Sequence, residues 1–211
     1  LKASVFESTA GDEPTSLTDY VTRAGADQDV IYYLTGESRQ QIERSPHLEA
    51  FRAKGIEVLL LSDPVDEMWT GAGPEFDGKT FVSIAKGEID LGDGADTEAE
   101  AEKAGEFAEL MTWMTGILDD QVSQTRLSNR LTESAACLVG DTFSMSPQLE
   151  KLYRASGQPV PRSKRILELN AEHPLVTGLA KSFADGDDQA ALEPTVKLLH
   201  AMALLAEGGE L

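Results

Sequence analysis

Cysteine and positive charge are both scarce in this sequence. Cys137 is the only cysteine, which excludes an internal disulfide framework and a cluster of thiolate metal ligands. Its apolar neighbours within 135–139 indicate a structural cysteine in a buried strand. The 37 acidic side chains against 18 basic ones give a formal net charge of −19, which repels DNA, RNA and anionic membrane surfaces at long range. We therefore expect no nucleic acid among its partners.

Long hydrophobic runs are missing as well. Residues 58–61 form one of the longest, far below the roughly 20 apolar residues that a membrane-spanning helix needs, and no basic and then apolar leader opens the chain. We therefore expect a soluble, cytoplasmic protein with no membrane partner. Leu1 is not an initiator methionine, and Leu211 follows directly on a helical pattern, so we expect a fragment of a longer protein.

Signatures of common enzyme sites are also few. The sequence has neither a Gly-x-Gly-x-x-Gly turn nor a Gly-x-Ser-x-Gly elbow, so dinucleotide binding and acyl transfer are not indicated. His47, His173 and His200 are scattered, and none has a second histidine at ligand spacing, which argues against a metal site built on histidine.

Length and composition bound the architecture. A chain of 211 residues with 41% hydrophobic content can form two modest domains, each with its own core. The strongest break in composition is the acidic stretch 87–106, which is rich in glycine and alanine and runs into a helical pattern. We therefore predict an α/β domain over residues 1–86 and an α+β domain over residues 87–211.

The first part shows a βαβ pattern. Residues 30–34 and 56–61 are apolar, strand-like runs, and the polar stretch between them has helical spacing. Ser45 is a candidate N-cap with Pro46 in the first turn, and Gly55 stands where a helix usually ends. Strands this apolar are typical of a parallel sheet covered on both faces, so we predict a small three-layer α/β unit.

The second part has strands and helices in succession. After the acidic stretch, Phe107, Leu110 and Met114 follow the spacing of one buried helix face. We predict strands at 125–131, 135–140 and 165–169, and helices at 147–156, from Pro174 and from Pro194. These elements predict a small three-stranded sheet with helices on one side.

Asp63, Asp66 and Glu67 form an acidic cluster directly after the strand-like run that ends at Leu61. Open α/β sheets place ligands at such strand ends, so one interpretation is a magnesium site of an enzyme. The other interpretation is structural: Asp63 caps a turn or helix before Pro64, and Asp66 and Glu67 lie at its positive end. The second is favoured.

The region of the 147–156 helix carries a single apolar face. It consists of Met145, Leu149, Leu152 and Tyr153, and Phe143 precedes it. Such a face either packs inward or binds partners, and periodicity alone favours packing because most amphipathic helices cover a core.

The last helix carries a second apolar stripe. Its large members are Val196, Leu198, Leu199, Met202 and Leu205. Burying the four leucine and methionine side chains would contribute on the order of 1.5 to 3 kcal/mol each before entropy is subtracted, enough to support a subunit interface. Packing within the chain would explain the same stripe, and the spacing of the residues does not distinguish this packing from a subunit interface.

Six short segments carry a resemblance to a known family. They are 32–36 (YYLTG), 45–49 (SPHLE), 55–63 (GIEVLLLSD), 75–79 (EFDGK), 130–134 (RLTES) and 167–170 (LELN). Taken in order, they closely resemble the bacterial ninety-kilodalton heat-shock chaperones. The resemblance covers essentially the whole chain: the end of the middle domain up to about residue 86, and then the C-terminal dimerisation domain without its last helix.

The resemblance implies a homodimeric, ATP-driven chaperone that binds unfolded or partly folded client proteins in the cytoplasm. In that family ATP and magnesium are held by an N-terminal domain, which would lie before Leu1. We therefore expect no cofactor and no ATPase activity in this fragment. A magnesium-dependent enzyme and a purely structural dimerisation module remain as alternatives.

The resemblance also implies roles for the apolar residues. It gives client contact to the face of the 147–156 helix and to a middle-domain patch at Glu67 and Met68. Some bacterial members carry a tryptophan at the position of Met68; here it comes one place later, as Trp69, which is therefore also a client-contact candidate. The stripe of the last helix matches one of two helices in the family's dimer bundle. Because the other would follow Leu211, we expect dimerisation that is weaker than in the parent, or rearranged.

Overall fold

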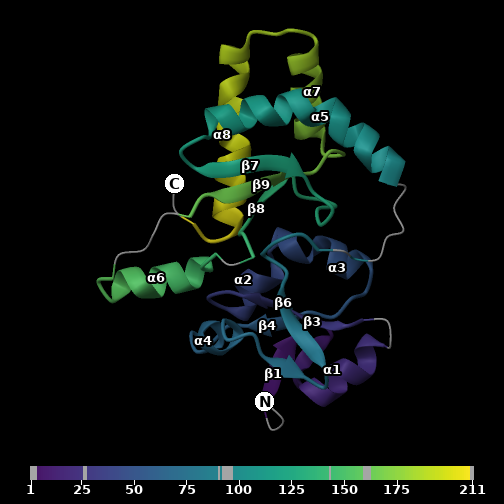
Figure 1. Ribbon diagram of the computed structural model, residues 1–211, viewed down its shortest axis with the longest axis vertical. Helices are drawn as coiled ribbons and strands as arrows, with labels where there is room; N and C mark the ends of the chain where they lie inside the picture. Colours follow the sequence, from purple (N-terminus) through teal and green to yellow (C-terminus); the bar gives the residue numbers. More distant parts are fainter. Residues whose placement is uncertain are drawn as a thin grey trace. The chain divides into compact units, whose positions relative to one another are not determined.

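The computed structural model describes residues 4–25, 28–89, 91, 97–142, 144–158 and 163–209. The chain divides into two compact units (Figure 1). Unit 1 comprises Leu1–Lys86 with Met145–Pro161, and unit 2 comprises Gly87–Ser144 with Arg162–Leu211. Each unit combines a β-sheet with helices, which confirms the mixed α/β class. Among the described residues, none of the helices has the length and hydropathy needed to cross a membrane.

The sheet of unit 1 has six strands in the order β2-β1-β4-β3-β6-β5. They are β1 (Val5–Ser8), β2 (Gly11–Ser16), β3 (Val30–Thr35), β4 (Leu59–Leu61), β5 (Glu75–Phe76) and β6 (Lys79–Ser83). The expected parallel pair is present, because β3 runs parallel to β4 with Tyr33 opposite Leu59. β3 is also parallel to β6, whereas β1, β2 and β5 pair antiparallel, so the sheet is mixed.

The helices of unit 1 are short. They are α1 (Leu17–Ala24), α2 (Arg39–Glu43), the 3-10 turn η1 (Pro46–Leu48), α3 (Glu49–Ala53), α4 (Asp66–Thr70) and α6 (Pro147–Ala155). The predicted cap is confirmed: the Ser45 side chain accepts a hydrogen bond from the backbone N–H of His47, with Pro46 in the first turn. Gly55 follows α3 at φ +67°, the left-handed conformation that ends many helices.

Tyr20 ties α1 to the sheet of unit 1. Its hydroxyl donates to the carbonyl of Glu57 at 2.9 Å and accepts from the backbone N–H of Tyr32 at 3.0 Å. The side-chain amide of Gln28 donates to the same oxygen at 3.1 Å. Burial away from water disfavours the phenolate and raises the pKa of Tyr20 from 10.0 to about 12.

We expect the Tyr20→Phe variant to lose about 1 to 3 kcal/mol of stability at neutral pH, because the Tyr32 N–H and the Glu57 carbonyl lose a partner. A raised pKa means that the fold favours the protonated phenol. This stabilisation is present below pH 10 and is lost as the pH rises from 10 to 12. Urea unfolding across this range should therefore show a steeper loss of stability in wild type than in the variant; equal slopes would contradict this.

The sheet of unit 2 has three strands in the order β7-β9-β8. They are β7 (Val122–Leu127), β8 (Ala136–Val139) and β9 (Arg165–Leu169), with β7 parallel and β8 antiparallel to β9. The helices are α5 (Thr97–Ile117), α7 (Pro174–Ala184) and α8 (Gln189–Ala206). α5 packs against β7 and α8 against β8, so the predicted apolar face of α5, including Leu110 and Met114, lies in one core (Figure 1).

Two predicted boundaries in unit 2 are wrong. The strand predicted over 125–131 lies at Val122–Leu127, because Ser128 and Arg130 turn their polar side chains to the carboxylate of Glu168. The last helix begins at Gln189 and not at Pro194: the Asp188 side chain accepts from the backbone N–H of Ala190 at 3.1 Å and caps it. Pro194 lies inside this helix, where its ring removes one N–H donor.

Candidate functional site

The acidic cluster after β4 forms a hydrogen-bonded turn. Asp63 accepts from the backbone N–H of Val65 at 3.0 Å, and Asp66 accepts from the backbone N–H of Asp63 at 3.1 Å. The other oxygen of Asp66 accepts from the indole N–H of Trp69 at 2.8 Å. Over the described part of the chain, no three His, Cys, Asp or Glu side chains converge in a way that could hold a metal ion. The structural interpretation therefore accounts for Asp63 and Asp66.

Glu67 differs from its two acidic neighbours. Its exposed fraction is only 9%, and its Oε1 is buried without a hydrogen-bond partner. It lines a pocket of about 380 Å³ at the carboxyl ends of β3 and β4. The pocket is lined by Thr35, Gly36, Glu37, Leu61, Ser62, Asp63, Pro64, Glu67, Lys151 and Ala155.

The apolar residues around Glu67 separate into exposed and packed ones. Met68 is 69% exposed, and Val65 on the preceding turn is also exposed. Trp69 packs instead against the rings of Phe6 and Phe81, with centroid distances of 5.9 and 5.3 Å. The exposed large side chain of α4 is therefore Met68, and Trp69 belongs to the core of unit 1.

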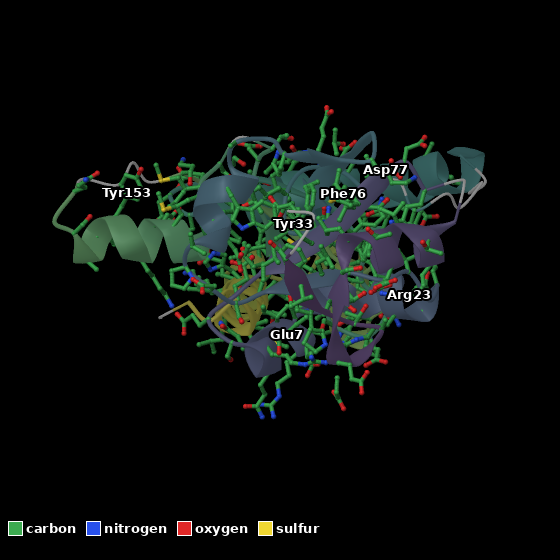
Figure 2. The ribbon with its side chains drawn as sticks, turned by 90° about the horizontal axis from the view of Figure 1, so that it is seen from below. Glu7, Arg23, Tyr33, Phe76, Asp77 and Tyr153 are labelled. Carbon is green, nitrogen blue, oxygen red and sulfur yellow. The ribbon has the colours of Figure 1, made fainter. Side chains whose placement is uncertain are left out.

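The predicted apolar face of α6 is only partly exposed. Met145, Leu149 and Tyr153 are half-buried, and Figure 2 labels Tyr153 on this helix. Phe143 and the side chain of Leu152 lie outside the described residues. Ser146 caps the helix by accepting from the backbone N–H of Leu149 at 3.1 Å. Lys151, on the same helix, forms an ion pair with Glu37 at 2.5 Å.

The apolar stripe of α8 divides into two faces. Val196 and Leu199 are buried in the core of unit 2. Leu198, Met202 and Leu205 are 50%, 41% and 53% exposed. The sequence pattern placed all five on one stripe, whereas the structure leaves three of them available to a partner.

A buried ion network in unit 2 was not anticipated from the sequence. The Glu168 carboxylate accepts from Arg126 at 2.7 Å and from Arg130 at 2.8 Å, and the hydroxyl of Ser128 donates to it at 2.7 Å. Both arginines also donate to the carbonyl of Gly87. The available signal was a single glutamate in the otherwise apolar run 166–169.

The spacing of a phosphate-binding loop, Gly-x-x-x-x-Gly-Lys-Thr, occurs at 73–80. Such a loop needs a following helix, whose N-terminal N–H groups bind the phosphate. Here the segment forms the hairpin of β5 and β6, with Asp77 and Gly78 at positive φ in its turn (Figure 2). Lys79 donates to the carbonyl of Gln28. The segment is therefore a turn and not a phosphate site.

Comparison with known proteins identifies the family. A family model described as "Hsp90 protein" matches residues 2–211. The chain belongs to the Hsp90 family. It is 60% identical over 216 residues to "Chaperone protein HtpG" of Rhodococcus jostii, covering 100% of the chain and 34% of that relative. The proteins of the same name from Nocardia farcinica and Streptomyces coelicolor are 55% and 58% identical, covering 100% and 99% of the chain and 34% and 33% of the relatives.

The chain spans about a third of the length of the curated Hsp90 relatives that it matches. The segments that carried the resemblance occupy defined places in the fold. Segment 75–79 is the β5–β6 hairpin, while 130–134 and 167–170 supply Arg130 and Glu168 to the buried network. These Hsp90-like segments therefore include both a turn and a buried ion pair.

Proposed function

We propose that this chain is the segment of an ATP-dependent Hsp90 chaperone that binds unfolded or partly folded clients and forms a homodimer in the cytoplasm. Residues 1–86 are the end of its middle domain, and residues 87–211 are its C-terminal dimerisation domain. The division of the structure between Lys86 and Gly87 supports this boundary, although Met145–Pro161 cluster with unit 1. The formal charge of −19 supports protein clients over nucleic acids or anionic membranes.

Exposed apolar side chains beside the Glu67 pocket carry the client-binding proposal. Met68 and Val65 stand in solvent although each would gain roughly 1.5 to 3 kcal/mol on full burial. An unfolded client exposes apolar segments that can bury such side chains. The half-buried face of α6, with Leu149 and Tyr153, adds a second surface of the same kind in unit 1.

We place ATP and magnesium in the parts of the parent outside this segment. The Asp63 and Asp66 carboxylates accept hydrogen bonds within a turn. Residues 73–80, which have the spacing of a phosphate-binding loop, form a hairpin. The purified segment is expected to show no ATP hydrolysis. Magnesium-dependent turnover that the Asp63→Ala change abolished would overturn this and support the enzyme alternative.

We expect the chain to bind a fluorescently labelled polypeptide that is kept unfolded by alkylated cysteines, as measured by anisotropy. Met68→Asp should weaken binding by about fivefold to tenfold, because a charge replaces an apolar contact. Val5→Asp is the matched control, since Val5 is equally exposed on β1 of the same unit. No binding by the wild-type chain would contradict client binding and leave a structural dimerisation module.

A further inference from the structure

One oxygen of the Glu67 carboxylate is buried without a hydrogen-bond partner. It is nine-tenths buried, its Oε1 has no hydrogen-bond partner, and no described basic side chain forms an ion pair with it. A buried charge without a partner is costly, because the low-dielectric interior does not replace the water that solvated it. Such groups cluster at functional sites, where a ligand can supply the missing partner.

Lys86 interacts electrostatically with Glu67, but the burial of Lys86 disfavours its charged form. Desolvation lowers the pKa of Lys86, and the nearby Glu67 only partly counters this. Among the described residues, no ion pair joins Lys86 to Glu67, and the Oε1 of Glu67 has no hydrogen-bond partner. A mobile cation from outside the chain can do so.

The pocket beside Glu67 has the shape and charge for one long cationic side chain. Its volume of about 380 Å³ lies near the lower end of small-ligand pockets. The lining of the pocket is mainly acidic, with the carboxylates of Glu37, Asp63 and Glu67. Its one ammonium group, that of Lys151, is already paired with Glu37. Leu61 and Pro64 supply apolar wall.

We propose that this pocket binds an arginine or lysine side chain of the client, with its charged head on Glu67. The aliphatic stem lies along Leu61 and Pro64, as long basic side chains do on apolar surfaces. Rotation of the Glu67 carboxylate about its last bond, a soft torsion, presents an oxygen to the pocket. Met68 and Val65 then take apolar residues next to the basic one. This rests on client binding as proposed above, and it names the class of segment: apolar residues with a basic residue among them.

A pair of peptides tests this in the 211-residue chain. Both carry the same apolar residues; one has a central arginine and the other citrulline, its neutral isostere. We expect the wild-type chain to bind the arginine peptide about tenfold more tightly, in keeping with a charge-assisted hydrogen bond. Glu67→Gln should remove that preference by weakening binding of the arginine peptide about tenfold. Glu75→Gln is the matched control and should keep it, because Glu75 is an exposed glutamate on β5 of the same unit and does not line the pocket.

The outcomes separate this inference from client binding itself. Equal binding of both peptides by the wild-type chain would overturn the cation pocket and leave client binding intact. Binding of neither peptide, nor of the unfolded polypeptide, would overturn both. If a folded Glu67→Gln chain still preferred the arginine peptide, the cation would bind to another carboxylate, and the proposal would be wrong. The wild-type comparison is decisive without any variant.

Discussion

The Glu168→Gln variant is expected to lose about 3 to 5 kcal/mol of the free energy of unfolding of unit 2, the usual cost of removing one partner from a buried ion pair. Glu168 and Arg130 are almost wholly buried, and Arg126 shares the same carboxylate. Glutamine keeps the shape but not the charge. Two guanidinium groups would then lose their buried countercharge and keep only neutral shared acceptors, the glutamine oxygen and the Gly87 carbonyl.

Urea unfolding measured by Trp113 fluorescence reports this loss, because Trp113 lies on α5 and its ring packs 5.1 Å from that of Phe183. A Trp69→Phe background removes the signal of unit 1, since the chain has only these two tryptophans. Glu88→Gln is the control: Glu88 pairs with Arg126 but its side chain is 84% exposed, so its change should stay within about 0.5 kcal/mol. Similar losses in both variants would contradict a buried network.

Changing Leu198 and Leu205 to aspartate together is expected to raise the dissociation constant of the homodimer by at least about a hundredfold. Each leucine would contribute roughly 1.5 to 3 kcal/mol on burial, and in a two-fold dimer both copies lose it. Both side chains are about half exposed on α8, so the monomer should tolerate the change. Sedimentation over a concentration series measures the constant.

Lys197→Glu provides the charge-matched control for this pair, because it lowers the net charge by the same two units at another exposed position of α8. It should leave the dimer nearly unchanged. A dimer that persisted in the double aspartate variant would place the subunit interface elsewhere on the chain. A dimer equally weakened by Lys197→Glu would point to general charge repulsion and not to the apolar face.

Local signals in the sequence predicted much of the fold. The β-branched and aromatic run of β3, the Ser45 cap and the one-sided apolar pattern of α5 were each readable within a few residues. β1 and β2 were missed because β2 is polar and largely exposed and β1 has only two apolar residues, so neither strand shows a long apolar run. The start of α8 was misplaced because Pro194 gives a stronger signal for a first turn than Asp188.

The candidate site depended on contacts between distant residues, which no local pattern records. Spacing could not show that Trp69 packs between Phe6 and Phe81 while Met68 faces solvent. It could not show that Glu67, alone of three adjacent acids, is buried without a hydrogen-bond partner at Oε1. The family resemblance supplied candidate residues, and their burial and partners came only from the structure.

Suppression of aggregation tests the central claim, client binding by this chain, most directly. The chain is added without ATP to a model protein unfolding on heating, and light scattering is measured. Wild type should suppress scattering, and Leu149→Asp plus Tyr153→Asp, with folding checked by circular dichroism, should lose most of this activity. Arg154→Asp, on the exposed side of the same helix, should retain it. Suppression by the double variant equal to wild type would remove α6 from the client surface, and no suppression by any of the three would contradict client binding itself.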